Sequence, residues 1–149
     1  MLFRSVMLAA VVAGAWYYER AHSASPSQLA ARTIIGSNLA LGTDGNEALG
    51  TYLIGYTGAA VYTHDGDTAS SSACYDACAQ EWPPYLVGSE DNIHQLKAGV
   101  RDVTSTITRT DGSLQLTYDG HPLYFYAADK ESNNPSGNGV SGAWHLVRP

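Results

Sequence analysis

The sequence has little positive charge, and this excludes one large class of partners. Its 149 residues include 8 Lys and Arg against 14 Asp and Glu, for a formal net charge of -6. No run of basic residues occurs anywhere in the chain. A surface that follows a phosphate backbone needs such a run, so we expect no nucleic-acid partner. We interpret the acidic balance mainly as a source of solubility.

Recognisable catalytic and cofactor motifs are also missing. The chain has no GxSxG, no P-loop, no dinucleotide-binding glycine pattern and no CxxCH, and its Gly-rich "SGNGVSG" lacks the strand-to-helix context of a phosphate loop. Its histidines form no HxH or HExxH pattern, so we predict no metal site and no cofactor. We therefore predict a protein that is not an enzyme, and we expect no small-molecule ligand. The five histidines are His22, His64, His94, His121 and His145.

Long hydrophobic runs are absent except at the N-terminus. The apolar run from Val6 to Tyr18 follows Arg4, and it is shorter than the roughly 20 residues of a comfortable transmembrane helix. We predict that residues 1–24 form an uncleaved helical membrane anchor, with Trp16, Tyr17 and Tyr18 at the outer interface. The alternative is a signal peptide cleaved near "AHSAS". Either interpretation places the rest of the chain outside the cytoplasm, anchored on the periplasmic face of the inner membrane or secreted.

Only two cysteines are present, and they lie close together in "ACYDAC". Cys74 and Cys78 are spaced i and i+4, so their side chains meet on one face of a helical turn. Outside the cytoplasm a disulfide is the expected state of such a pair. The alternative is a copper-binding or redox-active dithiol, because C-x3-C is also a metal-binding spacing.

An internal repeat is the strongest signal that is present. A shift of 62 residues, with no gap, gives six identities in the 27 positions from Tyr56 to Trp82, where composition alone predicts roughly two. A repeat of this kind indicates two units that bury one face against each other, so we expect the two repeated Trp residues to have related environments. The identical pairs are Tyr56 and Tyr118, Gly58 and Gly120, Tyr62 and Tyr124, Asp67 and Asp129, Ser70 and Ser132, and Trp82 and Trp144.

Each copy has the pattern of an antiparallel β-meander. "STITRTDGSLQLTYDGHPLYFYA" contains three alternating runs separated by Asp111-Gly112 and Asp119-Gly120, dipeptides favoured in type I′ hairpin turns. "SSACYDACAQEW" predicts a short helix in the first copy, capped by Ser71 or Ser72. We predict a mainly β tandem repeat with one short helix: a linker over 25–48 with one weakly indicated strand, then a domain over 49–149 with repeats at about 50–86 and 112–148. "EDNIHQLKAGV" predicts a short helix between the repeats, and "AWHLVRP" a last strand.

These motifs resemble the bacterial secreted repeats of unknown function, which are often described as lipoproteins. The resemblance rests on Y-x-[aromatic]-x-x-D, on C-x3-C-A-x-x-W-P-P and on Y-x-G-x-P-L-Y, and it covers about residues 50 to 147. The first motif is present as Tyr124, Tyr126 and Asp129, but in the first copy its middle position is His64. No lipobox cysteine is present. The resemblance implies an exported, mainly β tandem repeat with no assigned activity.

The repeated residues are expected to be structural, because a role shared by two copies in different surroundings is more easily structural than catalytic. Tyrosine buries a large ring and ties its hydroxyl to a polar partner, and aspartate caps turns through the backbone. Stacking on a flat ligand is the alternative for the tyrosines. His64, Asp65 and Asp67 carry oxygen and nitrogen ligands for a cation, but a plain turn is preferred there.

The predicted function follows from export and from the missing chemistry. We predict a non-catalytic, membrane-tethered accessory subunit that docks on a larger envelope complex, such as a respiratory or photosynthetic electron-transfer complex. The alternative is a metal- or cofactor-binding redox module that uses Cys74 and Cys78.

Overall fold

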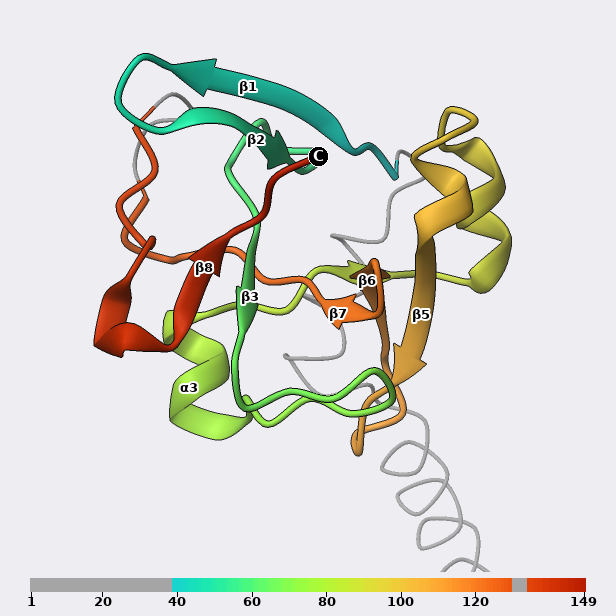
Figure 1. Ribbon diagram of the computed structural model, residues 1–149. Helices are drawn as coiled ribbons and strands as arrows, with labels where there is room; N and C mark the ends of the chain where they lie inside the picture. Colours follow the sequence, from blue (N-terminus) through green and yellow to red (C-terminus); the bar gives the residue numbers. More distant parts are fainter. Residues whose placement is uncertain (1–38, 130–133) are drawn as a thin grey trace, which may run out of the picture. The chain divides into compact units, whose positions relative to one another are not determined.

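The computed structural model describes residues 39–129 and 134–149, which form a mainly β structure with one short α-helix, as predicted. The predicted anchor, with Trp16, Tyr17 and Tyr18, lies outside these residues. In the part of the chain that is described, no helix has the length and hydropathy needed to cross a membrane. The elements are β1 (Gly42–Asn46), β2 (Gly50–Ile54), β3 (Tyr62–His64), α3 (Asp76–Glu81), β4 (Leu86–Val87), η1 (Glu90–Gln95), η2 (Arg101–Val103), β5 (Thr104–Thr108), β6 (Leu114–Tyr118), β7 (His121–Pro122), η3 (Val140–Gly142) and β8 (Trp144–Leu146) (Figure 1).

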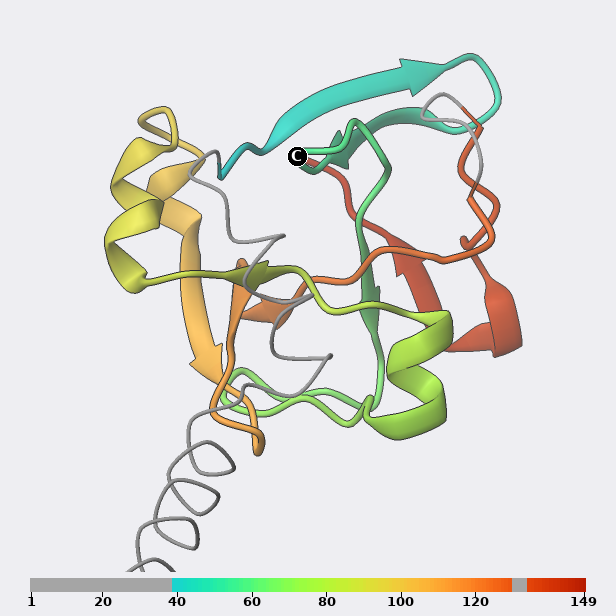
Figure 2. The ribbon, with the colours of Figure 1, turned by 180° about the vertical axis from the view of Figure 1, so that it is seen from behind.

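The first copy begins with the β1–β2 hairpin, whose first strand lies in the region predicted as a linker and whose second strand lies in the predicted domain. The Asn46 side chain closes this turn, because its Oδ1 accepts the backbone N–H groups of Ala48 and Leu49. The chain then turns through residues 55–59 and continues into β3. In Figures 1 and 2, the hairpin lies at the opposite end of β3 and β8 from α3.

The second copy repeats this meander with β5, β6 and β7. Asp119 and Gly120 both have positive φ (48° and 76°), as the predicted two-residue type I′ turn requires. The predicted type I′ turn at Asp111-Gly112 is wrong. Arg109 and Ser113 instead close a three-residue loop through a backbone hydrogen bond of 2.8 Å, with only Gly112 left-handed, at φ 81°.

The last strand of each copy pairs with the other copy. In the first copy, β3 pairs antiparallel with β8 from the second copy, aligning Tyr62 with Leu146. In the second copy, the segment after β7 pairs with the segment before β4, where Phe125 donates to the Pro83 carbonyl at 2.8 Å. Each half of the fold is therefore completed by a strand from the other half.

A local two-fold axis relates the two copies and passes between Tyr62 and Tyr124. These equivalent residues pair with each other, and the backbone N–H of each donates to the carbonyl of the other at 2.9 Å. Neighbouring bonds follow the same symmetry: Tyr85 donates to Leu123 at 2.8 Å, and Val147 donates to Val61 at 3.1 Å. The repeat read from the sequence is thus a repeat of backbone structure.

The symmetry shows one register error in the sequence comparison. Leu53 donates to the Val147 carbonyl, and Leu116 donates to the Tyr85 carbonyl, both at 2.8 Å. The two acceptors are 62 residues apart (147 − 85), but the two donors are 63 apart (116 − 53). The first copy has one extra residue in the turn over 55–59, so the prediction of a repeat without a gap is wrong at this turn.

The short helix begins later than predicted. α3 starts at Asp76, its N-cap residue is Tyr75, and no side chain caps it, so the predicted Ser71 or Ser72 cap is wrong. Between the copies, the helix predicted over 90–100 is the 3-10 helix η1 over Glu90–Gln95, and a second 3-10 helix, η2, follows it at Arg101–Val103. η1 carries a capping box in which Ser89 and Asn92 bond each other's backbone.

The core consists of two buried clusters. One gathers the repeated aromatic residues at the local two-fold axis, and the other gathers mainly aliphatic side chains beneath the meanders. The first contains Tyr52, Ala60, Tyr62, Cys74, Trp82, Tyr124, Trp144 and Leu146, and the second contains Leu53, Val61, Tyr85, Val87, Leu116, Leu123 and Val147.

Candidate functional site

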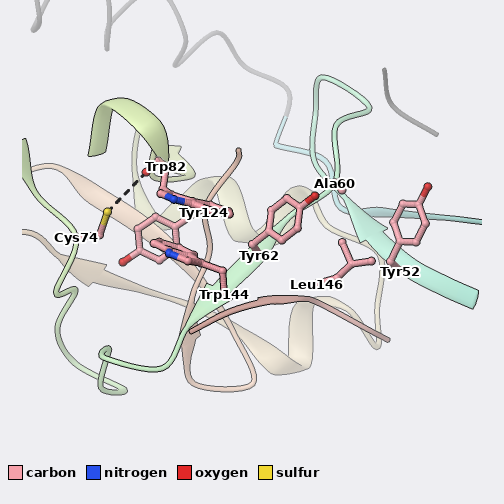
Figure 3. Close-up of a cluster of buried hydrophobic side chains, with 8 residues drawn as sticks. All are labelled: Tyr52, Ala60, Tyr62, Cys74, Trp82, Tyr124, Trp144 and Leu146. Carbon is pink, nitrogen blue, oxygen red and sulfur yellow. Dashed lines mark hydrogen bonds between the residues drawn. The ribbon is translucent and has the colours of Figure 1, made fainter. Parts of the chain in front are cut away.

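The two repeated tryptophans stack on each other at the local two-fold axis. The Trp82 and Trp144 ring centroids are 3.9 Å apart and the planes differ by 3°. Figure 3 shows this pair with the rings of Tyr62 and Tyr124 next to it. Each tyrosine points its edge at one indole, with Tyr62 5.4 Å from Trp82 and Tyr124 5.1 Å from Trp144. The copies therefore meet through the rings that they share.

The middle residue of each Y-x-[aromatic]-x-x-D motif extends this stack at both ends. Tyr126 lies on Trp82 with centroids 4.1 Å apart, and His64 lies on Trp144 at 4.4 Å. The four rings form one column in the order His64, Trp144, Trp82, Tyr126. The departure of the first copy from the aromatic pattern thus replaces one flat ring by another at the end of the column.

The tyrosine of the first copy is bound by the aspartate of the second. Tyr62 donates its hydroxyl proton to Asp129 Oδ2 at 2.6 Å, and its oxygen accepts the Gly137 N–H at 3.2 Å. Gly137 must be glycine, because a Cβ there would lie 2.8 Å from the Trp82 ring and 2.9 Å from Tyr62. The loop of the second copy is thereby fixed to the first.

The symmetry-related tyrosine has a different bonding partner. The Tyr124 hydroxyl pairs with Ser72 Oγ at 2.7 Å, with the Asp67 carboxylate nearby. Burial raises the pKa of Tyr124 to about 12, and the charge of Asp67 acts in the same direction. Burial, followed by the bond to Asp129, also raises the pKa of Tyr62 well above its usual value. Both hydroxyls therefore remain protonated at neutral pH.

Both motif aspartates also order their own loops. Asp67 Oδ1 accepts the Ala73 N–H at 2.8 Å, and Asp129 Oδ1 accepts the Ser136 N–H and hydroxyl at 2.8 and 2.7 Å. Each carboxylate thus holds the loop that leads to its own tryptophan. It also acts on the tyrosine of the opposite copy.

Cys74 and Cys78 form the predicted disulfide, with their Cα atoms 5.2 Å apart. Cys74 is fully buried, and it lies beside Trp82 in the first core cluster (Figure 3). The alternative use of this pair as a dithiol or metal site would require reduction, because metal binding uses the thiolate form.

A buried arginine next to the disulfide was not found from the sequence. Arg109 is 4 % exposed, and its guanidinium donates to Gln115 Oε1 at 2.6 Å, Cys74 O at 2.7 Å and Ser72 Oγ at 3.0 Å. Its charge also lies over the Tyr75 ring, 4.3 Å from the centroid. A lone arginine after a strand carries no sequence signal for such a role, since the partners come from distant segments.

His64, Asp65 and Asp67 do not converge on a common point. Asp65 pairs with His145 at 2.9 Å near the surface, whereas His64 Nδ1 lies 3.7 Å from Asp67 Oδ1 in the interior. His64 Nδ1 and Asp67 Oδ2 are buried without a hydrogen-bond partner in the described part of the chain. Among residues 39–129 and 134–149 no group of three or more His, Cys, Asp or Glu side chains is placed to hold a metal ion.

Tyr56 and Tyr118 are not structurally equivalent, because of the extra residue in the first turn. Tyr118 pairs with His121 across its turn, and the matching position in the first copy is Gly55, which bonds Ala59. Tyr56 instead lies in the longer turn of the first copy, where residues 56–58 replace the two-residue turn of the second copy, and it is 37 % exposed. The prediction of a shared role for Tyr56 and Tyr118 is therefore wrong.

The arrangement of the motif side chains is better suited to holding the two copies together than to a chemical reaction. Within the described residues, the motif rings and carboxylates bond mainly to one another or to the local backbone.

Comparison with known proteins agrees with the symmetry of the fold. A family model described as a secreted repeat of unknown function matches residues 45–85 and 105–148. Each matched segment covers one copy of the repeat. The first begins in β1 and ends at Tyr85, and the second begins in β5 and ends just after β8. No curated protein and no solved structure gives a significant match.

Proposed function

The chain belongs to the family of secreted repeats of unknown function, and on this premise we propose that it is a non-catalytic accessory subunit that docks on a larger complex of the cell envelope. We propose a respiratory or photosynthetic electron-transfer complex as the host. The leading segment would tether the domain to the membrane on the extracytoplasmic side.

One observation carries this proposal. The residues that define the repeat are used to join its two copies: the Trp pair stacks, the Tyr62 hydroxyl binds Asp129, and the disulfide closes beside the stack. A domain whose distinctive groups serve its own cohesion offers a rigid surface rather than a reactive centre. Rigid surfaces that present aromatic side chains suit protein docking, because aromatic residues are enriched at the centres of interfaces.

Export supports the same proposal. The family is one of secreted repeats, and a closed disulfide is the expected state of a cysteine pair outside the cytoplasm. The apolar run from Val6 to Tyr18 would keep such a domain at the membrane. Mass spectrometry of the mature N-terminus tests the tether: a chain that begins near residue 1 retains it, and one that begins after residue 24 has lost it.

Co-purification tests the docking function. Membranes are solubilised gently, the extract is fractionated by size, and the proteins that migrate with the chain are identified by mass spectrometry. We expect the chain to migrate with a large membrane complex and to remain with it through a second, independent separation. Migration only as a free monomer under every mild detergent would contradict the proposal.

A further inference from the structure

The two copies provide an internal control for what the fold requires. Where both copies make the same packing contact at the two-fold axis, they carry the same residue, as at Tyr62 and Tyr124 or Trp82 and Trp144. An exposed aromatic group that occurs in only one copy is therefore not explained by the fold. One such group is present, and we call the rings of Tyr56, Tyr85 and Phe125 the aromatic corner.

The three rings of the aromatic corner contact one another. The Tyr56 centroid lies 5.4 Å from that of Tyr85 and 5.6 Å from that of Phe125, and Tyr85 and Phe125 are 4.9 Å apart. Close approach depends on Gly55, where a Cβ would lie 2.6 Å from the Phe125 ring. Tyr56 is 37 % exposed and Phe125 is partly exposed, so these two rings present surface to solvent, whereas the Tyr85 ring is buried beneath them.

The positions of the other copy that match Phe125 and Tyr85 carry no aromatic ring. Phe125 corresponds to Thr63 and Tyr85 to Val147, because each pair occupies the same position in the exchanged strands. Tyr56 lies in a turn of three residues, and the matching turn has only two, Asp119 and Gly120. Threonine, valine and a shorter turn thus satisfy the same backbone, so the fold does not require the exposed ring of Tyr56 or the partly exposed ring of Phe125.

The start of the described chain lies at this corner. The Tyr85 hydroxyl donates to the Ala40 carbonyl at 2.7 Å and accepts the Tyr56 N–H at 3.3 Å. The 38 residues before Leu39, which contain the apolar run ending at Tyr18, therefore join the domain beside the exposed rings. The chain from Tyr18 to Leu39 spans at most about 75 Å, so a tethered corner stays within that distance of the membrane surface.

We propose that the aromatic corner is the docking surface for the host complex, and that its occupant is an apolar segment on the extracytoplasmic side of a membrane protein. This inference rests on the proposed function and adds the surface and the chemistry of the partner. Tyrosine and phenylalanine supply large contact areas with little loss of side-chain entropy, which suits the centre of an interface. The absence of charged side chains among the three rings favours an apolar partner over an ionic one.

The test uses the full-length chain in native membranes. A photo-crosslinking phenylalanine derivative replaces Tyr56, and as a control it replaces His121, an exposed residue directly after the matching turn. We expect an adduct with a host subunit at position 56 and none at position 121. A crosslink from position 56 to residues 1–38 of the same chain, or equal adducts at both positions, would overturn the proposal.

A second measurement separates this inference from the proposed function. The double variant Tyr56→Ser with Phe125→Thr introduces at 125 the residue of the other copy, and Asp119→Asn is the control in the matching turn. We expect the double variant to lower recovery of the host complex by about tenfold or more, with an unchanged near-UV spectrum of the Trp pair. Unchanged recovery would overturn the docking surface while leaving the docking function intact. Failure of the unaltered chain to recover any complex would overturn both.

Discussion

Tyr62 and Tyr124 occupy equivalent positions, yet they give their hydroxyls to different partners. Tyr62 binds a carboxylate and a backbone N–H, whereas Tyr124 binds Ser72. The rings are both fully buried and serve the same packing role. At the scale of the residue, the two copies therefore share the position of the tyrosine ring, but the hydrogen-bond partner of the hydroxyl differs between them.

Substitution of Tyr62 by Phe should reduce stability by about 1–3 kcal/mol. The change keeps the ring but leaves the partly buried Asp129 carboxylate and the buried Gly137 N–H without their partner. Chemical denaturation followed by fluorescence measures the effect, and Tyr118→Phe is a matched control, since the Tyr118 ring lies outside the two-fold contact. Equal effects of the two variants would contradict the role assigned to the Tyr62 hydroxyl.

Alkaline pH should destabilise the protein through its buried phenols. Burial raises the pKa of Tyr85 and of Tyr124 to about 12, while an unfolded tyrosine ionises near 10. The folded state then holds these protons more tightly, so their stabilising contribution is complete below about pH 10 and is lost as pH rises toward about 12. Denaturation midpoints measured against pH should fall over this window, less steeply in Tyr85→Phe and Tyr124→Phe. A single ionisation of all tyrosines near pH 10 in folded protein would contradict this.

The exchanged strands show how an element can be short and still specific. β3 and β8 contain three residues each, and β4 and β7 contain two, which is below the length at which a lone hairpin is stable. β3 and β8 are held in place because they carry His64 and Trp144, two of the four rings of the stacked column. The packing of these strands against the core thus compensates for their short length.

Loss of one indole should be visible by circular dichroism. Trp82 and Trp144 stack face to face in a fixed orientation, so their transitions couple, and they should give an exciton pair of bands where their in-plane transition axes are not parallel. Trp144→Phe should remove this couplet while keeping an aromatic ring in the column. His64→Tyr, which copies Tyr126, should keep the couplet and change stability by less than about 1.5 kcal/mol. A couplet that survives Trp144→Phe would contradict the stacked pair.

Arg109 connects the second hairpin to the disulfide loop of the first copy. Arg109→Lys should reduce stability by about 2 kcal/mol or more, because a single ammonium cannot reach Ser72, Gln115 and the Cys74 carbonyl together. Arg101→Lys is the control, since Arg101 is exposed. Thermal unfolding of both variants measures the difference, and equal midpoints would contradict the role assigned to the Arg109 guanidinium.

At the scale of the whole described domain, the exchange of last strands makes each half depend on the other. Hydrogen bonds cross between copies at Tyr62 with Tyr124, at Phe125 with Pro83 and at Val147 with Val61. Neither copy can complete its core alone. Unfolding should therefore be a single cooperative transition in which all probes coincide.

Cleavage between the copies should leave a folded complex. Gly99 lies in the exposed connection between η1 and η2, and a Cβ added to it would have no atom within 4 Å, so a protease site can be placed there. The two fragments should stay together in gel filtration, even after reduction, because the disulfide lies within the first fragment. A matched insertion in the exposed turn at Thr110 serves as control. Separation of the fragments in native buffer would contradict the exchange.

The sequence by itself determined the repeat, the β-meanders, the disulfide and the importance of the shared rings. These follow from local periodicity, from the scarcity of tryptophan and from a spacing of four residues, all of which act along the chain. Only the tertiary structure decided that the last strands change places, that the aspartate of the second copy binds the tyrosine of the first, and that Arg109 joins a loop far away in sequence. The extra residue in the turn that contains Tyr56 was also missed from the sequence. One inserted residue in a turn barely alters a sequence comparison, but it changes which side chains of the turn are exposed. Contacts between distant segments depend on how two faces meet, and no local pattern encodes that.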